Sequence, residues 1–313
     1  MGLDKKRAPI SPDNELFVQN EGGGEIRPFQ YYYIQIIAHT YTQRQRVRNI
    51  FIPPGVPMPS LKHLKTKKGR DETGLFMVEG EKLIAEIPED YKILYYVVSR
   101  KFADTHDLTR YRTRARCEVI RDSLFESLAA TVTPQGIIAV CRQIQHSLND
   151  ILQPSGFILM GENLSDPGNI GTLVRTAAAA GASGVILTAG SCDLFSPKVL
   201  RAAAGAVLRM PIVTEANSAK TMEELKKQSI PIYAAHPRGN ALPYNINLSG
   251  QFCLLVGNES HGISDKAEAM ADALVHLPMT NDTESLNASV AGSILLYEAV
   301  RQRLDLIRQK PLV

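Results

Sequence analysis

The second half of the chain shows a regular alternation of short apolar runs and longer helical stretches. The apolar runs are at 157–160, 185–188, 231–235, 252–256 and 273–277, and the helical stretches at 171–181, 197–206, 218–228, 264–271 and 286–304. Near-continuous apolar strands that alternate with helices are typical of a mostly parallel sheet covered on both faces. The pattern therefore predicts an α/β domain over residues 156–313, with its ligands beyond the carboxyl ends of the strands.

A smaller α/β domain is predicted ahead of it, since a chain of 313 residues usually forms two domains. Residues 60–142 combine strand-like runs rich in β-branched and aromatic residues with short helical stretches. We interpret the polar segment 143–155, which contains Pro154, as the linker. Residues 1–59 contain breaker-rich segments around an apolar patch, and we interpret them as a poorly ordered extension or a start-site artefact. The strand-like runs are at 75–80, 93–99, 117–120 and 136–141, and the helical stretches at 81–87 and 122–129.

Composition excludes several classes of protein. No run of about 18 apolar residues exists and the N-terminus lacks an apolar signal core, so we expect neither a membrane span nor secretion. The four cysteines are scattered and the seven histidines have no metal-ligand spacing, so we expect no disulfide framework, no metal and a cytoplasmic location. The dinucleotide, P-loop, zinc-protease and nucleophile-elbow motifs are all missing from the sequence.

Basic residues concentrate in two runs of the first half, although the net charge is only +3. A single run is most often a solvated face, but two in the same half favour binding of phosphates. The first run comprises Lys62, Lys65, Lys67, Lys68 and Arg70, and the second Arg100, Lys101, Arg110, Arg112, Arg114 and Arg116.

Three loops of the second half carry side chains suited to chemistry. In the first, Asn169 is a candidate helix N-cap, and Arg175 stands out in a helix of apolar and small residues. Arg175 is either a surface side chain or a clamp for a phosphate near a helix N-terminus. The second loop, 257–262, has two glycines that predict a tight turn, and Glu259 as a general base or a structural acceptor.

The third loop precedes the last helix. Ser285 is a candidate N-cap for that helix. Asn287 is either a local cap or a hydrogen-bonding partner of a substrate.

The three loops, in this order, resemble the three motifs of the SpoU/TrmH type of the SPOUT methyltransferase superfamily. The matching strings are NLSDPGNIGTLVRTAAAAG, LLVGNESHGIS and LPMTNDTESLNASVAGSILLYEAVRQR, and they span essentially all of 156–304. The string LKHLKTKKGRDETGLFMVEGEKLI, at 61–84, resembles the start of the family's auxiliary substrate-binding domain, whose fold is like that of small RNA-binding ribosomal proteins.

The resemblance implies an RNA methyltransferase that moves a methyl group from S-adenosylmethionine to a ribose 2′-hydroxyl. It further implies a C-terminal trefoil knot, a rare exception among folds, and a homodimer packed through the knot. By motif position, the cofactor would be held by Val256, Gly257, Leu277, Met279 and Leu286.

The same resemblance assigns the catalytic roles. Arg175 would bind a phosphate and stabilise developing alkoxide charge, because a guanidinium is a poor base. Asn169 and Asn287 would orient Arg175 or the ribose, while Glu259 and Ser285 would shape the site. The basic residues of both runs would hold the RNA backbone.

Several alternatives stay open at the level of sequence. The separate first domain favours 23S (large-subunit) rRNA over tRNA as the substrate, but a tRNA 2′-O-methyltransferase fits the same motifs. A non-catalytic RNA-binding or ribosome-assembly factor with this fold is a second alternative, and a base methyltransferase is a third. The sequence does not separate housekeeping from antibiotic resistance.

Overall fold

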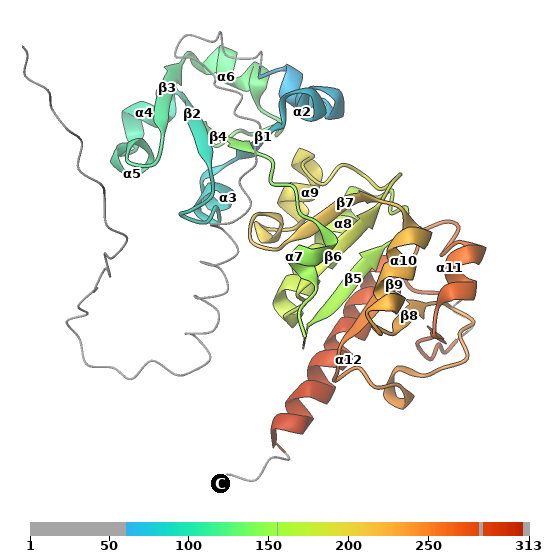
Figure 1. Ribbon diagram of the computed structural model, residues 1–313. Helices are drawn as coiled ribbons and strands as arrows, with labels where there is room; N and C mark the ends of the chain where they lie inside the picture. The colour runs from blue at the N-terminus through green and yellow to red at the C-terminus, as the bar shows by residue number, and fades with distance from the viewer. Residues whose placement is uncertain (1–60, 155, 282–283, 309–313) are drawn as a thin grey trace, which may run out of the picture. The chain divides into compact units, whose positions relative to one another are not determined.

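The computed structural model describes residues 61–154, 156–281 and 284–308. The interpretation of residues 1–59 lies outside these ranges. The described part of the chain has two β-sheets, one of four strands and one of six (Figure 1). The predicted α/β class with a mostly parallel sheet is confirmed, whereas the trefoil knot and the domain boundaries stay predictions.

The four-stranded sheet has the order β1-β4-β2-β3 and is mixed. Strand β4 is antiparallel to both β1 and β2, while β2 and β3 are parallel. Its strands are β1 (Leu75–Glu79), β2 (Ile93–Ser99), β3 (Arg116–Ile120) and β4 (Ile137–Arg142). Its helices are η1 (His63–Lys65), α2 (Lys67–Thr73), α3 (Glu81–Ala85), α4 (Arg100–Thr105), α5 (Thr109–Arg112) and α6 (Asp122–Leu128).

The six-stranded sheet has the order β10-β8-β9-β5-β6-β7, and all its neighbouring strands are parallel. The chain moves outward from β5 to β6 and β7, then returns to build β8, β9 and β10 on the other side of β5. Strands β5 and β9 therefore flank the point where the strand order reverses. The strands are β5 (Phe157–Gly161), β6 (Gly184–Thr188), β7 (Ile212–Ala216), β8 (Ile232–Ala235), β9 (Phe252–Val256) and β10 (Ala273–Val275).

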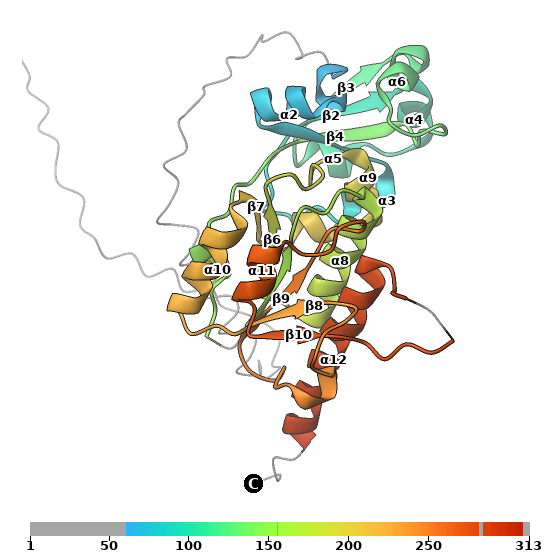
Figure 2. The same ribbon diagram turned by 90° about the vertical axis from the view of Figure 1, so that its right-hand side faces the viewer.

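Helices cover both faces of this sheet (Figure 2). Helices α8 (Pro167–Ala180), α9 (Pro197–Ala202) and α12 (Ala288–Arg308) bury apolar residues against one face. Helices α7 (Leu148–Ile151), α10 (Ser218–Lys227) and α11 (Asp265–Met270) do so on the other. The faces follow strand alternation: in β5, Phe157 and Leu159 pack with the first group of helices, Ile158 and Met160 with the second. The short η2 (Ala206–Leu208) and η3 (Pro243–Asn245) complete the elements.

Two predicted helix starts were wrong. Helix α8 begins at Pro167, and the carboxylate of Asp166, not the side chain of Asn169, caps it by accepting from the Asn169 amide at 2.8 Å. Helix α12 begins at Ala288 and runs to Arg308 rather than 304. The carboxamide oxygen of Asn287 accepts from the Ser289 and Val290 amides, so Asn287 takes the capping role predicted for Ser285. In both loops several capping residue types stand close together, and only the backbone path selects one.

Several elements were not predicted from the sequence, among them α2, β7, α4 and α5. Strand β7 pairs only with β6 in the described sheet, so it needs no continuous apolar run. Helices α4 and α5 lie within the second basic run, where the high charge obscured the few buried positions such as Phe102 and Tyr111.

Candidate functional site

A cavity of about 440 Å³ lies at the carboxyl ends of β8, β9 and β10. Its walls come from the loop after each of these strands and from the start of α12. A cavity of this size lies in the range of small-molecule sites. Its place beside the reversal of strand order is where parallel sheets bind ligands.

All five residues predicted to hold a cofactor line this cavity. They are Val256, Gly257, Leu277, Met279 and Leu286. Of the residues predicted to act in catalysis, Glu259 and Ser285 also line it, whereas Asn169, Arg175 and Asn287 do not. The wall therefore combines apolar side chains with the backbone of a glycine-containing loop.

The loop after β9 has the tight turn that its two glycines predicted. Asn258 and Gly262 exchange two backbone hydrogen bonds of 2.8 and 2.9 Å. Gly262 has a φ of 71°, which favours glycine. A Cβ on Gly257 would lie 2.3 Å from the Gly262 carbonyl carbon and the Ile263 nitrogen, so a larger residue there would push the turn open.

Glu259 joins the loop after β9 to the loop after β5. Its carboxylate accepts hydrogen bonds from the Ser165 hydroxyl at 2.9 Å and from the Asn169 side-chain amide at 2.9 Å. It also accepts from the backbone amides of Ser165 and Asp166, both at 3.2 Å. The Asn258 side chain adds a bond of 2.7 Å to the Asn163 carbonyl. Two of the three predicted loops are thus held together by side chains.

Hydrogen bonding also decides the charge of Glu259. Partial burial disfavours its ionised form, but the bonds from Asn169, Ser165 and the loop backbone outweigh burial and lower its pKa to about 2. A carboxylate with this pKa stays ionised at neutral pH and is a poor proton acceptor. Of the two roles predicted for Glu259, the geometry favours the structural acceptor, with Asn169, itself 6% exposed, as its partner.

Arg175 lies at the surface, which is one of the two settings that the sequence left open. It is exposed on α8, in the third turn, and it does not line the cavity. The hydroxyl of its neighbour Thr176 lies 3.1 Å from the Ser293 hydroxyl of α12. Arg175 therefore stands close to the contact between the two helices that cover one face of the sheet.

The sequence did not point to several polar residues of the site. His236, Arg238 and His261 line the cavity. Glu162 is 7% exposed and directly follows β5. Its carboxylate accepts hydrogen bonds from Ser264, the N-cap of α11, and from Ser218, the first residue of α10. Position immediately after an apolar run was the one signal that could have found Glu162 and His236.

Arg70 differs from the four lysines of the first basic run. Arg70 is 4% exposed, and its guanidinium bonds Asp193 and the Leu64 carbonyl, so it is closed to a phosphate and its predicted role is wrong. Lys65 donates to the carbonyls of Ser127 and Ala129. All four lysines of the run are exposed. Lys67 lies beside Glu215, and Lys68 lies 3.8 Å from Glu72.

Two further findings concern metals and membranes. Among the described residues, no three or more His, Cys, Asp or Glu side chains gather as a metal site would require. Within the same ranges, every helix is too short or too polar to cross a bilayer.

Comparison with known proteins connects both sheets to one kind of protein. The profile of the SpoU rRNA methylase family matches residues 156–297, and that of an MRM3-like substrate-binding domain matches residues 58–139. The 23S rRNA (guanosine(2553)-2′-O)-methyltransferase RlmP of Bacillus subtilis (strain 168) is 34% identical over 236 residues, which are 75% of this chain and 92% of RlmP.

Solved structures agree with this assignment. The SpoU methyltransferase AviRb from Streptomyces viridochromogenes, in complex with AdoMet, aligns with a TM-score of 0.72 and 25% identity over 78% of this chain and 97% of AviRb. An AdoMet-bound rRNA methyltransferase from Sinorhizobium meliloti aligns with a TM-score of 0.69 and 31% identity over 77% of this chain and 93% of that one. The chain therefore belongs to the SpoU rRNA methylase family, as its three motifs predicted.

Proposed function

We propose that this protein transfers a methyl group from S-adenosylmethionine to a ribose 2′-hydroxyl of RNA, with 23S rRNA as the substrate. The observation that carries the proposal is the cavity beside the reversal of strand order. The loops after β9 and β10 line it, and the chain that contains it belongs to this family. The name of RlmP supports rRNA as the substrate class, as does the separate first domain.

The cavity fits the proposed cofactor. Val256, Leu277, Met279 and Leu286 offer an apolar surface for an adenine ring, while the backbone of the loop after β9 offers hydrogen bonds to polar groups. When bound, S-adenosylmethionine supplies an electrophilic methyl group on a sulfonium centre.

The chain's own contribution would be to position and stabilise the reacting hydroxyl. Holding it in line with the methyl group is the larger part of such catalysis. Arg175 would bind the neighbouring phosphate and stabilise the negative charge that develops on the ribose oxygen. Glu259 and Asn169 would act indirectly, by fixing the two loops that frame the site. Ser285 lines the cavity and would contact the ribose, and Asn287 would set the start of α12.

We propose further that the protein is a homodimer packed through α12. This helix exposes Val290, Ile294, Tyr297 and Leu304 to 44–53%. Their spacing of three, four and seven residues places them on one stripe of the helix. Because Arg175 lies close to α12, a dimer through this stripe would bring Arg175 of one protomer toward the other protomer.

The four cysteines are free thiols, which supports a reducing compartment such as the cytoplasm. Two other functions remain as alternatives. A tRNA 2′-O-methyltransferase would use the same cavity, and a non-catalytic assembly factor would keep the fold without binding the cofactor.

One experiment separates these functions. Calorimetric titration of the full chain with S-adenosylmethionine is followed by transfer of labelled methyl to unmodified 23S rRNA and to tRNA. We expect cofactor binding and label in rRNA alone. Alkaline hydrolysis should leave this label in resistant dinucleotides, which distinguishes ribose 2′-O-methylation from base methylation. Arg175→Ala should lower turnover by more than about tenfold, roughly 1.4 kcal/mol, while cofactor affinity stays unchanged. Label in tRNA alone would select the tRNA alternative, and absence of cofactor binding would select the assembly factor.

A further inference from the structure

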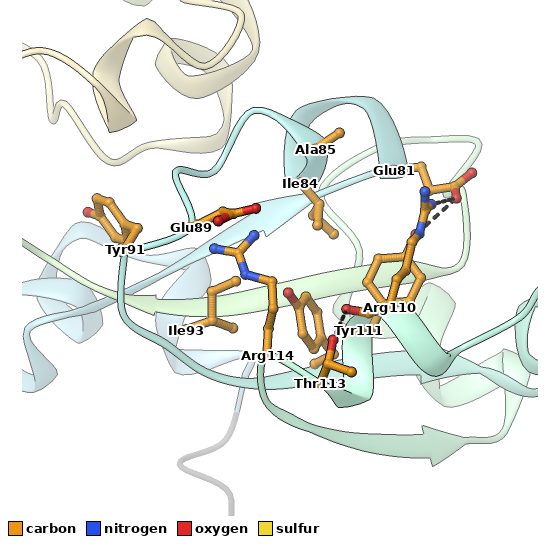
Figure 3. A pocket seen from close by; sticks show the side chains of 11 residues that line it. Glu81, Ile84, Ala85, Glu89, Tyr91, Ile93, Arg110, Tyr111, Thr113 and Arg114 are labelled. Carbon is orange, nitrogen blue, oxygen red and sulfur yellow. Dashed lines mark hydrogen bonds and ion pairs between the residues drawn. The ribbon is translucent and has the colours of Figure 1, made fainter. Parts of the chain in front are cut away.

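The first domain contains a cavity of about 600 Å³ that none of the three motifs reaches. It lies between α3, α5 and the ends of β2, and Figure 3 shows the side chains that extend into it. Its wall combines two carboxylates, two guanidinium groups and the rings of several tyrosines. Glu81, Glu89, Tyr96, Arg110, Tyr111 and Arg114 carry the argument below.

One end of this cavity is a closed network. The Tyr111 hydroxyl donates to the Glu81 carboxylate at 2.9 Å, and Arg110 bonds the same carboxylate. The Arg110 guanidinium also lies 4.6 Å from the centre of the Tyr111 ring, in a cation–π contact. These three side chains therefore form a rigid, flat wall whose polar groups have partners.

The polar groups elsewhere in the cavity are fixed but not saturated. Arg114 donates to the Ile87 and Pro88 carbonyls, which hold its guanidinium in place, and a guanidinium has five N–H donors in all. Glu89, exposed on the loop before β2, has neither an ion pair nor a hydrogen bond within the described ranges. A carboxylate and a guanidinium thus face one cavity from two different loops without being paired (Figure 3).

Tyr96 lies at the buried end of the cavity. Its side chain is fully buried on β2, and its ring lies 5.3 Å from that of Tyr111. Its hydroxyl finds no hydrogen-bond partner among the described residues. Burial raises the pKa of Tyr96 to about 12, so the hydroxyl keeps its proton. A buried hydroxyl without a partner is costly, unless a ligand or an ordered water satisfies it.

We propose that this cavity binds one unpaired guanine nucleotide of the RNA substrate, away from the methylated ribose. RNA-binding proteins recognise unstacked bases by stacking them on aromatic or guanidinium planes and by hydrogen bonds to their edges. Guanine alone offers neighbouring N1–H and N2–H donors, which suit the Glu89 carboxylate, together with O6 and N7 acceptors, which suit Arg114. The Tyr111–Arg110 wall supplies the stacking surface. The inference rests on the proposed function, because it takes RNA as the substrate.

This proposal gives the second basic run a more specific role. Arg110 of α5 and Arg114, which follows α5, line the cavity, while Arg112 of α5 is exposed. An exposed guanidinium beside the cavity would hold the phosphate of the inserted nucleotide. The first domain would then select its RNA by one base as well as by backbone charge.

The test uses the full chain and two variants that leave the fold intact. Glu89→Gln removes an exposed, unpaired charge, and Tyr96→Phe removes only an unsatisfied hydroxyl. The controls are Glu126→Gln, an exposed carboxylate on α6, and Tyr95→Phe, an equally unpartnered hydroxyl on the other face of β2. Affinity for an unmodified 23S rRNA transcript is measured by filter binding, alone and with each of the four nucleoside 5′-monophosphates.

We expect Glu89→Gln and Tyr96→Phe to weaken rRNA binding by about fivefold or more, with both controls unchanged. The direction is diagnostic for Glu89, since loss of a negative charge would otherwise strengthen binding to RNA. GMP should weaken rRNA binding by wild type at concentrations where AMP, CMP and UMP do not. This effect of GMP should be lost in the two cavity variants.

Failure of this inference is distinct from failure of the proposed function. If wild type binds S-adenosylmethionine and methylates rRNA while both cavity variants bind rRNA as wild type does, the nucleotide cavity is overturned and the enzyme stands. If GMP binds in a Glu89-dependent way but rRNA binding is unaffected, the cavity serves a free nucleotide and the RNA inference is overturned. If wild type neither binds the cofactor nor methylates RNA, the proposed function falls, and rRNA affinity still decides the cavity.

Discussion

The Glu259 carboxylate joins the loops after β5 and β9 through four hydrogen bonds. Such a carboxylate stabilises the fold only while it is ionised. Its pKa of about 2 in the folded protein lies below the ordinary value of 4.5. Its contribution to stability is therefore fully present above pH 4.5 and is lost as the pH falls from there toward 2.

This linkage gives a prediction for Glu259→Gln. At neutral pH we expect the variant to lose on the order of 1 kcal/mol of unfolding free energy, a small figure because the exposed side chain is screened by solvent. Urea unfolding of both proteins at a series of pH values measures the difference. It should be constant above about pH 5 and shrink toward pH 2, as the linkage requires. A difference that stayed constant down to pH 2 would mean that the charge of Glu259 does not matter.

Single residues also show how far local sequence could be interpreted. Sequence alone left Asn287 as either a helix cap or a substrate partner, and the structure places its side-chain oxygen at the start of α12. The role of Arg70 was predicted from charge alone, yet the residue is buried against Asp193, which is 123 positions away in the chain. A partner so distant cannot be inferred from neighbouring residues.

At the scale of elements, α12 is the helix whose surface is least explained by the described chain. One side packs on α8 and the sheet, where Leu295, Leu296 and Ala299 are buried. The opposite side exposes the stripe that includes Ile294 and Tyr297. Apolar surface of this kind is expected to be covered by a partner.

Ile294→Glu tests the dimer proposed for this stripe. A buried, unpaired carboxylate in the interface should weaken association by about 100-fold or more. Analytical ultracentrifugation at micromolar concentration would then report a monomer, against a dimer for wild type. Ala269→Glu is the matched control, because it places the same charge at an exposed position of α11, on the other face of the sheet. Equal sedimentation of Ile294→Glu and wild type would exclude this stripe as the interface.

The helices and strands differ in how well they could be predicted from the sequence. The five apolar runs of the second half all correspond to strands of the six-stranded sheet. Four of them are central strands, which must be apolar on both faces, and the fifth is the edge strand β10. Strand β7, at the other edge, was not predicted because its burial is incomplete and it contains the polar residues Thr214 and Glu215. Helices α4 and α5 are of six and four residues, too short for a helical period to stand out.

At the scale of the whole molecule, contacts tie the two sheets together. Arg70 pairs with Asp193, and the rings of Phe76 and Phe195 lie 4.7 Å apart. The first basic run is therefore divided in function. Arg70 is part of the packed structure, and the exposed lysines are the residues of this run that we propose to bind RNA.

The salt dependence of RNA binding should reflect this division. We expect a Lys62→Ala/Lys68→Ala double variant to reduce the slope of log affinity against log salt by about 1 to 2, because each phosphate contact releases counterions. Arg70→Ala should leave that slope unchanged and instead lower the unfolding free energy by about 3 kcal/mol, since it strands a buried partner. Lys220→Ala/Lys266→Ala, which removes two exposed lysines from the second domain, is the control. An unchanged slope in the first double variant would show that its lysines form only a solvated face.

The sequence by itself determined the α/β class, the positions of most strands along the chain and the family, because strand burial and loop motifs depend on local patterns. Through the family resemblance, it also pointed to five residues that line one cavity. Tertiary structure alone decided the charge of Glu259, the burial of Arg70, the exposure of Arg175 and the second cavity around Tyr96. Each of these depends on groups far apart in the chain, and only the folded backbone brings such groups within hydrogen-bonding distance.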